Sequence, residues 1–265
     1  MKLRLDKLLV EQGLAASRER AQALILAGRV LVNEQKVDKP GTPVAADAKL
    51  RMLGSDLRYV SRGGLKMEQA LQHWALDVTG RNCVDIGTST GGFTDCLLQQ
   101  GAARVLCVDT GYGQIAQKLR DDPRVTLMER TNARLLQPGE FAAYARGGSI
   151  GLLAMDVSFI SATLVLPAVI AAIRSVNGIA TAQSQFDAGF ASEFDAVILV
   201  KPQFEAGREN IGKGGIVRDP AAQQMAVDRV CAAITELGGQ QIEVIDSPIL
   251  GMEGNREFLL HARFA

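Results

Sequence analysis

Short apolar runs alternate with helical stretches over the last two thirds of the chain. Apolar runs typical of buried strands predict strands at 82–87, 103–109, 124–128, 150–156, 195–201, 241–246 and 257–264. Helical periodicity falls between them, at 91–100, 113–120, 161–176 and 220–237. This alternation predicts an α/β fold with a mostly parallel sheet covered on both faces. Because the final run alternates polar and apolar residues, we expect it to be an antiparallel edge strand.

The first 60 residues follow a different pattern, which predicts a small α+β module. Leucines at positions 5, 8 and 9 have helical spacing, and Ser17 is placed to cap a second helix that Gly28 ends. Apolar residues on either side of the polar turn 33–36 predict a hairpin, and a further strand is expected near 49–53. Two helices followed by a hairpin form a compact unit.

These patterns divide the chain into two domains. We expect residues 1–60 to form the small module, residues 61–80 to be a linker and the start of the second domain, and residues 81–265 to form the α/β domain. The segment 177–194 is polar and rich in small residues, so it is expected to be a surface loop.

The formal net charge is zero, but the charges are unevenly distributed. Residues 1–66 carry 13 Lys and Arg against 7 Asp and Glu, whereas the remainder carries 16 against 22. A basic module on an acidic body indicates a polyanionic partner such as RNA, although chance surface charge is the alternative. Phosphate contacts are expected from the basic residues Arg4, Arg18, Arg20, Arg29, Lys36 and Arg62.

Several features concern the cellular compartment. No apolar run approaches the roughly 18–20 residues that span a bilayer. The first residues include acids and lack a small-residue cleavage site, so we expect no signal peptide. Because the four cysteines are far apart, neither a disulfide framework nor a metal site is expected. The predicted location is the cytoplasm.

The first strand of the expected sheet leads into a glycine-rich turn, DIGTSTGGF, from Asp85 to Phe93. Ligands of open α/β sheets bind beside this turn, beyond the carboxyl ends of the strands. The spacing G-x-x-x-G-G differs from the dinucleotide fingerprint, and Asp85 would repel a phosphate. We therefore predict a ligand with a positive amine, such as S-adenosylmethionine; a purely structural turn is the alternative. The predicted contacts are Asp85, Gly87, Thr88, Ser89, Gly91, Gly92 and Phe93.

Polar residues at the next strand ends extend this candidate site. Asp109 follows the glycines by about 20 residues, where a carboxylate commonly binds ribose hydroxyls. Asn132 follows the third strand, where an adenine edge could be read, and Asp156 ends the fourth. Asp109 and Asn132 could also be polar strand ends without a role. Around Asp156 there is neither an Asn/Asp-Pro-Pro-aromatic motif nor a cysteine nucleophile, which disfavours methylation of bases.

Lys201 closes an otherwise apolar strand, which is costly unless the lysine is paired or functional. A structural salt bridge is one explanation. Methyl transfer to a ribose 2'-hydroxyl is another, because this weak acid needs a group that accepts or steers its proton. Lys66 is the candidate cation that would favour a neutral Lys201. Asp156 and Glu257 are candidate carboxylates, and we expect Glu257 to orient Lys201.

Long motifs then identify a resemblance to a known family. The segments YVSRGGLKMEQAL, DIGTSTGGFTDCLLQQGA, VDTGYGQ, ERTNAR, MDVSFIS, VKPQFEAGRENIGKGGIVRDP and GNREF resemble the TlyA (hemolysin A) family of FtsJ-like rRNA methyltransferases. Residues 5–33, LDKLLVEQGLAASRERAQALILAGRVLVN, resemble the small RNA-binding module that pseudouridine synthases share with a small-subunit ribosomal protein. The resemblance implies a class I (Rossmann-like) methyltransferase fold and S-adenosylmethionine-dependent methylation of cytidine 2'-hydroxyls in ribosomal RNA. It also implies a catalytic tetrad of Lys66, Asp156, Lys201 and Glu257.

The chain departs from the family pattern at a few points and leaves other functions open. Thr88 and Thr110 stand where alanine and an aliphatic residue are expected, and the loop 177–194 is longer than usual. The short ends favour members that modify large-subunit rRNA, with small-subunit rRNA as a further substrate. The alternatives are a non-catalytic ribosome-binding or assembly factor, a membrane-active haemolysin and a base methyltransferase. The sequence predicts no oligomeric state.

Overall fold

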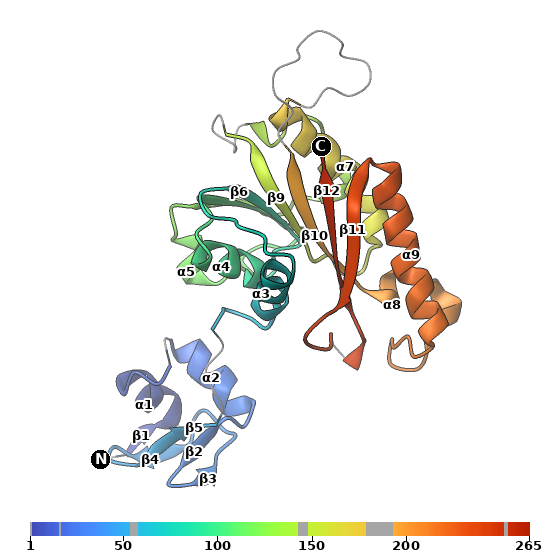
Figure 1. Ribbon diagram of the computed structural model, residues 1–265. Helices are drawn as coiled ribbons and strands as arrows, with labels where there is room; N and C mark the ends of the chain where they lie inside the picture. The colour runs from blue at the N-terminus through green and yellow to red at the C-terminus, as the bar shows by residue number, and fades with distance from the viewer. Residues whose placement is uncertain (1, 16, 54–57, 143–147, 179–192, 252–253) are drawn as a thin grey trace. The chain divides into compact units, whose positions relative to one another are not determined.

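A computed structural model describes residues 2–15, 17–53, 58–142, 148–178, 193–251 and 254–265 (Figure 1). Its contacts divide the chain into two compact units, Met1–Arg58 and Tyr59–Ala265. Most of the loop expected at 177–194 lies outside the described residues. Each unit has its own apolar core.

The first unit contains two helices and five short strands. Its elements are β1 (Lys2–Arg4), α1 (Leu5–Glu11), α2 (Arg18–Leu26), β2 (Val30–Val32), β3 (Gln35–Lys36), β4 (Pro43–Ala45) and β5 (Leu50–Met52). β2 pairs with β3 and β5, whereas β1 pairs with β4 in a two-stranded sheet that the sequence pattern did not predict. Leu5, Leu9 and Ile25 are fully buried, which confirms the expected apolar faces of both helices.

Local signals fix the ends of these elements. The Ser17 side chain accepts a hydrogen bond from Arg20 N at the start of α2, as its position predicts. Gly28 has φ +65° just beyond the end of that helix. Asn33 and Glu34, with φ of 50° and 67°, form a tight turn between β2 and β3. Two successive residues with positive φ match the twist of a two-residue hairpin.

The second unit is built on a seven-stranded sheet. Its strands are β6 (Asn82–Ile86), β7 (Arg104–Val108), β8 (Val125–Met128), β9 (Ile150–Met155), β10 (Phe194–Val200), β11 (Gly239–Asp246) and β12 (Phe258–Phe264). Its helical segments are α3 (Gly63–His73), α4 (Gly92–Gln99), α5 (Gln117–Arg120), η1 (Ala133–Leu135), α7 (Ala162–Asn177), α8 (Pro202–Glu205), η2 (Arg208–Asn210) and α9 (Pro220–Glu236). The order β11-β12-β10-β9-β6-β7-β8 confirms the predicted mostly parallel α/β sheet.

The final strand differs from the expectation in one respect. β12 is antiparallel to β10, as predicted, but it lies inside the sheet because β11 pairs with its other side. The prediction of an edge strand was therefore wrong. Leu259, Leu260 and Ala262 are fully buried, so both faces of β12 are covered, and within this strand Arg263 alone is exposed. Sequence alternation alone could not show that β11 occupies the edge.

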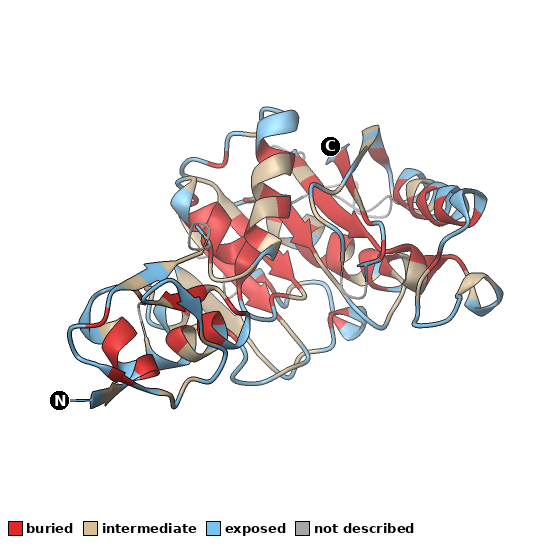
Figure 2. Ribbon diagram, turned by 90° about the horizontal axis from the view of Figure 1, so that it is seen from below, coloured by how far each residue is buried: buried red, intermediate tan, exposed pale blue. Residues whose placement is uncertain are grey.

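Apolar cores cover both faces of the sheet (Figure 2). On one face, Val84 and Ile86 of β6 belong to the core that includes residues of α7 and α9. On the other face, Cys83 belongs to the core that includes residues of α3 and α4. The helix α3 was not predicted, because its first residues are glycines. It contributes Met67 and Ala70 to the second core.

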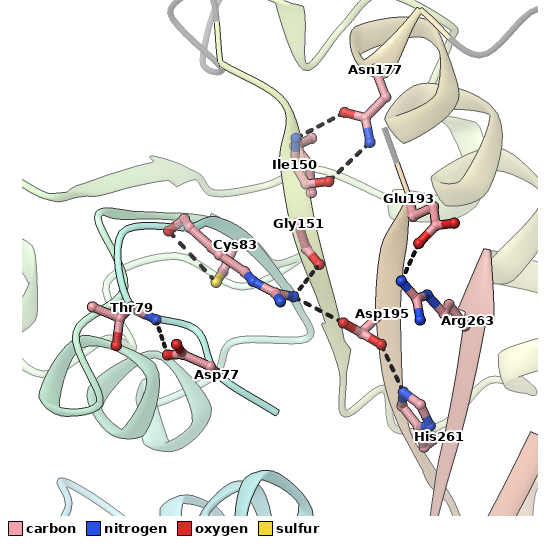
Figure 3. A network of polar contacts seen from close by, with 11 residues as sticks. Asp77, Thr79, Cys83, Ile150, Gly151, Asn177, Glu193, Asp195, His261 and Arg263 are labelled. Carbon is pink, nitrogen blue, oxygen red and sulfur yellow. Dashed lines mark hydrogen bonds and ion pairs between the residues drawn. The ribbon is translucent and has the colours of Figure 1, made fainter. Parts of the chain in front are cut away.

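A polar network fastens the strands near the amino-terminal end of β10 (Figure 3). Asp195 accepts a hydrogen bond from Arg81 over 2.9 Å, and its other oxygen lies 2.9 Å from His261 Nε2 on β12. The Asn177 side chain exchanges two hydrogen bonds with the backbone of Ile150. These contacts hold the strands together at one end of the sheet. The carboxyl ends of the parallel strands lie at the opposite end.

Candidate active site

The turn after β6 brings the ends of two strands close together. Gly87 has φ +83°, and a Cβ there would lie 2.4 Å from the backbone oxygen of Asp156. Glycine is therefore required both by the backbone conformation and by the close approach. Gly91, with φ +94°, has a different role, since a Cβ there would lie 2.3 Å from a methyl group of Leu119. Glycine at position 91 therefore lets the start of α4 lie close to the side chain of Leu119.

Asp85 is a buried carboxylate at the start of the turn. It is 1% exposed and accepts hydrogen bonds from Thr94 N and Thr94 Oγ1, at 3.1 and 2.6 Å. Its other oxygen, Oδ1, has no hydrogen-bond partner in the described residues. Burial raises the pKa of Asp85 to about 7, and the nearby Asp156 adds to the effect. An unpartnered buried carboxylate oxygen suits a cationic ligand.

Asp109 and Asn132 lie at the ends of the next two strands. Asp109 accepts hydrogen bonds from Ser89 N and Gly111 N, both over 2.7 Å, so it ties the glycine-rich turn to the loop after β7. Asn132 caps η1 by accepting a hydrogen bond from Arg134 N over 3.1 Å. Both side chains therefore make hydrogen bonds within the protein that do not depend on a ligand.

Two cavities open beside these strand ends. The larger, of about 450 Å³, is lined by residues that include Gly87, Ser89, Asp109, Asn132 and Asp156. The smaller, of about 280 Å³, is lined by residues that include Asp85, Thr88, Gly92, Phe93, Lys66, Lys201, Glu257 and Arg62. They share Gly87, Ser89, Asp156 and Ser158. Of the predicted ligand contacts, only Gly91 lines neither of these two cavities.

Two buried ion pairs line the smaller cavity. Lys201 Nζ lies 2.6 Å from Asp156 Oδ1, and Lys66 Nζ lies 2.5 Å from Glu257 Oε2. The side chains of Lys66, Glu257 and Lys201 are at most about a tenth exposed, whereas that of Asp156 is 23% exposed. The four side chains come from α3, the end of β9, the end of β10 and the start of β12. The fold thus brings together the four residues predicted from distant parts of the sequence.

The pairing inside this group differs from the expectation. We expected Glu257 to orient Lys201, but Glu257 pairs with Lys66 and Asp156 holds Lys201. The sequence analysis also missed Ser158, whose Oγ accepts a hydrogen bond from Lys201 Nζ over 2.7 Å. It missed Gly251, where a Cβ would lie 2.1 Å from Glu257 Oε1. The only sequence signal for Ser158 is a hydroxyl two residues after Asp156.

The basic residues of the first unit are held in different ways. Arg4 and Arg18 both donate to Asp6, a carboxylate with no exposed surface, over 2.9–3.0 Å. Gln22 donates to the same carboxylate. Arg29 Nε donates to the Leu53 carbonyl over 3.0 Å. Arg4, Arg18 and Lys36 are exposed, whereas Arg20 and Arg29 are partly buried. Asp6 therefore fixes two of the predicted phosphate-binding guanidinium groups.

Comparison with known protein families defines the class of protein. A model of FtsJ-like methyltransferases matches residues 59–264, and a model of the S4 domain matches residues 3–50. The first match covers most of the chain, so the protein is an FtsJ-like methyltransferase, here joined to an S4 domain. More particularly, it belongs to the TlyA (hemolysin A) family, as its full-length relatives show.

These relatives are similar over almost the whole chain. The 16S/23S rRNA (cytidine-2'-O)-methyltransferase TlyA of Mycobacterium tuberculosis is 43% identical, with 98% of this chain and 89% of TlyA covered. Hemolysin A of Brachyspira hyodysenteriae is 36% identical, with 98% and 99% covered. The solved structure of a Streptococcus thermophilus protein, named as a proposed hemolysin, has a TM-score of 0.71 and 41% identity, with 100% and 89% covered.

The cofactor of this class of enzyme is S-adenosylmethionine, and the residues present fit it. The unpartnered oxygen of Asp85 suits the ammonium group of the cofactor, and Gly87 leaves room for a ligand beside the strand ends. The larger cavity has a volume suited to a molecule of this size. As to the alternative of a membrane protein, none of the helices in the described ranges is long and apolar enough to span a bilayer.

Proposed function

We propose that this protein transfers a methyl group from S-adenosylmethionine to the 2'-hydroxyl of cytidine in ribosomal RNA. The observation that carries the proposal is the group of two ion pairs, the buried pair Lys66–Glu257 and the largely buried pair Lys201–Asp156, around the smaller cavity. Burying charged groups costs free energy, so two ion pairs around a cavity favour a catalytic role over a purely structural one. Such a cavity suits an acceptor hydroxyl that must lose its proton. Relatives named as cytidine-2'-O-methyltransferases support the choice of acceptor.

We assign the cofactor to the larger cavity and to the turn that both cavities share. Asp85 would bind the amine, Asp109 the ribose hydroxyls and Asn132 the adenine edge. Backbone and side chains of the turn would complete the site, namely Gly87, Thr88, Ser89, Gly92 and Phe93. The cofactor supplies a methyl group bonded to a positively charged sulfur. Asp156 lines both cavities, so donor and acceptor would meet beside it.

The chain's own residues then have to hold the acceptor hydroxyl and accept its proton. Lys201 lines the smaller cavity and is the proposed proton acceptor. Asp156 fixes the position of its nitrogen. Lys66 adds positive potential to the same cavity and is itself held by Glu257. These roles make Lys66, Asp156, Lys201 and Glu257 the proposed catalytic tetrad.

The S4 domain is the proposed RNA-binding part of the protein. Exposed basic side chains of the first unit would contact phosphates, namely Arg4, Arg18 and Lys36 together with the partly buried Arg20 and Arg29. Arg62, which is exposed and lines the smaller cavity, would contact the RNA near the acceptor. The proposed substrate is large-subunit rRNA, with small-subunit rRNA as a second target, and the proposed location is the cytoplasm.

The experiment that tests this function maps methylated nucleotides in rRNA from cells with and without the protein. Nuclease digestion and mass spectrometry should show a 2'-O-methylcytidine in rRNA from cells that contain the protein. The same position should be unmethylated in cells that lack it. Purified enzyme should restore it, with separate reactions on free rRNA, on each subunit and on whole ribosomes. A methylated base would indicate a base methyltransferase. Ribosome binding without any methyl transfer would indicate a non-catalytic assembly factor.

A further inference from the structure

Ser158 lies where the two cavities meet, two residues after Asp156. It lines both cavities and is exposed. Lys201 Nζ donates a hydrogen bond to Ser158 Oγ over 2.7 Å. Neither the tetrad nor the cofactor contacts proposed above include this hydroxyl. Its position beside Lys201 Nζ therefore indicates a role that those assignments do not cover.

The contacts of Lys201 leave one direction open. Asp156 Oδ1 forms an ion pair with Nζ over 2.6 Å, and Ser158 Oγ accepts a hydrogen bond from Nζ over 2.7 Å. Within the described ranges, this is the one hydrogen bond that Nζ makes. A tetrahedral nitrogen with two fixed partners has its remaining position fixed as well. In the charged form this position is a third N–H. In the neutral form one N–H bonds to Ser158 and the other faces the Asp156 carboxylate, so the remaining position is the lone pair.

A single partner would not have this effect. With Asp156 alone, the amine could rotate about its contact, and the lone pair would sample several directions. The lysine side chain has four rotatable bonds and does not fix the orientation of its own nitrogen. The second partner has to be an acceptor close to the nitrogen, and Ser158, which also lines both cavities, is such a group.

We propose that Ser158 is a positioning residue that directs the lone pair of Lys201 at the acceptor hydroxyl in the smaller cavity. The inference rests on the proposed ribose methylation. As the acceptor oxygen forms its bond to the methyl carbon, the bond from that carbon to the sulfonium of the donor would break and leave its electron pair on a neutral sulfur. The hydroxyl proton would pass to the Lys201 lone pair, so the lysine would become an ammonium. Ser158 accepts a hydrogen bond from the nitrogen and Asp156 lies beside it both before and after this transfer, so neither has to move.

The same contacts determine how the reaction should depend on pH. The charged groups around Lys201 are Asp156 beside it, together with Asp85, Lys66, Glu257 and Arg62 on the same cavity. An acceptor hydrogen-bonded to an ammonium favours the charged form. Removing the Ser158 hydroxyl should therefore move the acid limb of the pH–rate profile to lower pH, by about half a unit to one unit.

The test compares Ser158→Ala with Ser158→Thr in the full chain, using methyl transfer to ribosomal subunits that lack the modification. We expect Ser158→Ala to lower kcat by about tenfold to a hundredfold, the scale of a misplaced catalytic group. The KM for the subunit and the affinity for S-adenosylmethionine should stay near the wild-type values. Ser158→Thr keeps the hydroxyl and should restore most of the rate and the wild-type pH profile.

Ser161→Ala is the matched control, since it removes a hydroxyl from the same segment. Ser161 Oγ caps α7 by accepting from Thr163 N and bonds to Glu205, without contact to Lys201. This variant should lower the thermal stability but leave the pH profile unmoved.

Two results would overturn the proposal. One is a wild-type kcat for Ser158→Ala, and the other is a loss of rate with an unmoved pH profile, as expected of a merely structural hydroxyl. A wild-type enzyme that transfers no methyl group to ribose would instead contradict the proposed function, and the inference with it. The two failures are distinguished by the wild-type reaction alone.

Discussion

Asp85 is the residue whose protonation the fold changes most clearly. Its pKa is about 7 in the folded protein because of burial, against about 3.9 in an unfolded chain. A raised pKa means that Asp85 contributes stability below about pH 4 and that this contribution is lost as the pH rises toward 7. A bound cation favours the charged carboxylate, so cofactor binding should offset the loss.

The variant Asp85→Asn tests this account. Without cofactor, its melting temperature should exceed that of the wild type at pH 8, and the difference should shrink toward pH 4. Its affinity for S-adenosylmethionine, measured by calorimetry, should be at least tenfold weaker at pH 8, since one charge-assisted contact is worth about 1.5–3 kcal/mol. Unchanged affinity in a folded variant would contradict the assignment of Asp85 to the amine.

Asp6 is perturbed in the opposite direction. Hydrogen bonds from Arg4, Gln22 and Arg18 hold the pKa of this carboxyl well below its usual range. A depressed pKa contributes stability above about pH 4, which is lost as the pH falls. Hydrogen exchange should show that Asp6→Asn opens the first unit more readily at pH 7, with a smaller difference at about pH 2, close to the depressed pKa of the folded protein. An equal difference at both pH values would exclude the ionised Asp6 as the cause.

At the scale of elements, the loop between β11 and β12 controls one of the two ion pairs. A Cβ at Gly251 would lie 2.1 Å from Glu257 Oε1, so Gly251→Ala should displace Glu257 from Lys66. We expect kcat to fall by about tenfold or more, while cofactor affinity is unchanged because Gly251 lines only the smaller cavity.

Gly254→Ala, in the same loop, is the control for the expected loss of rate in Gly251→Ala. Gly254 has φ +88° and no heavy atom within 4 Å of a Cβ, so Gly254→Ala adds backbone strain of about 1 kcal/mol without touching Glu257. Its kcat should remain close to wild type. If both alanine variants lost rate equally, loop strain rather than the position of Glu257 would be responsible.

The element scale also shows what the sequence could predict. The strands and the strand-end positions of Asp85, Asp156 and Lys201 follow from apolar runs that end in polar residues. The helix α3 was missed because its start, Gly63-Gly64, disfavours a helix in isolation. The inner place of β12 and the pairing of Glu257 with Lys66 were missed because both depend on contacts between distant segments, which local periodicity does not contain.

At the scale of the whole molecule, the basic first unit and the methyltransferase unit should contribute separately to RNA and cofactor binding. Neutralising Arg18, Arg20 and Lys36 together should weaken RNA binding and flatten its salt dependence. The slope of log K against log salt should fall by about one for each lost phosphate contact. Cofactor affinity should not change. An unchanged slope would contradict the proposed RNA surface.

The central claim, that Lys201 accepts the proton of a ribose 2'-hydroxyl, is tested most directly by single-turnover methyl transfer with Lys201→Ala and Lys201→Arg. A positioned base contributes about 10²–10⁴-fold to rate, so Lys201→Ala should lose activity on that scale while binding cofactor and RNA nearly normally. Lys201→Arg should fail as well, because guanidinium does not release its proton near neutral pH. Full activity of the arginine variant would contradict the claim and leave Lys201 only as a charge that positions the substrate.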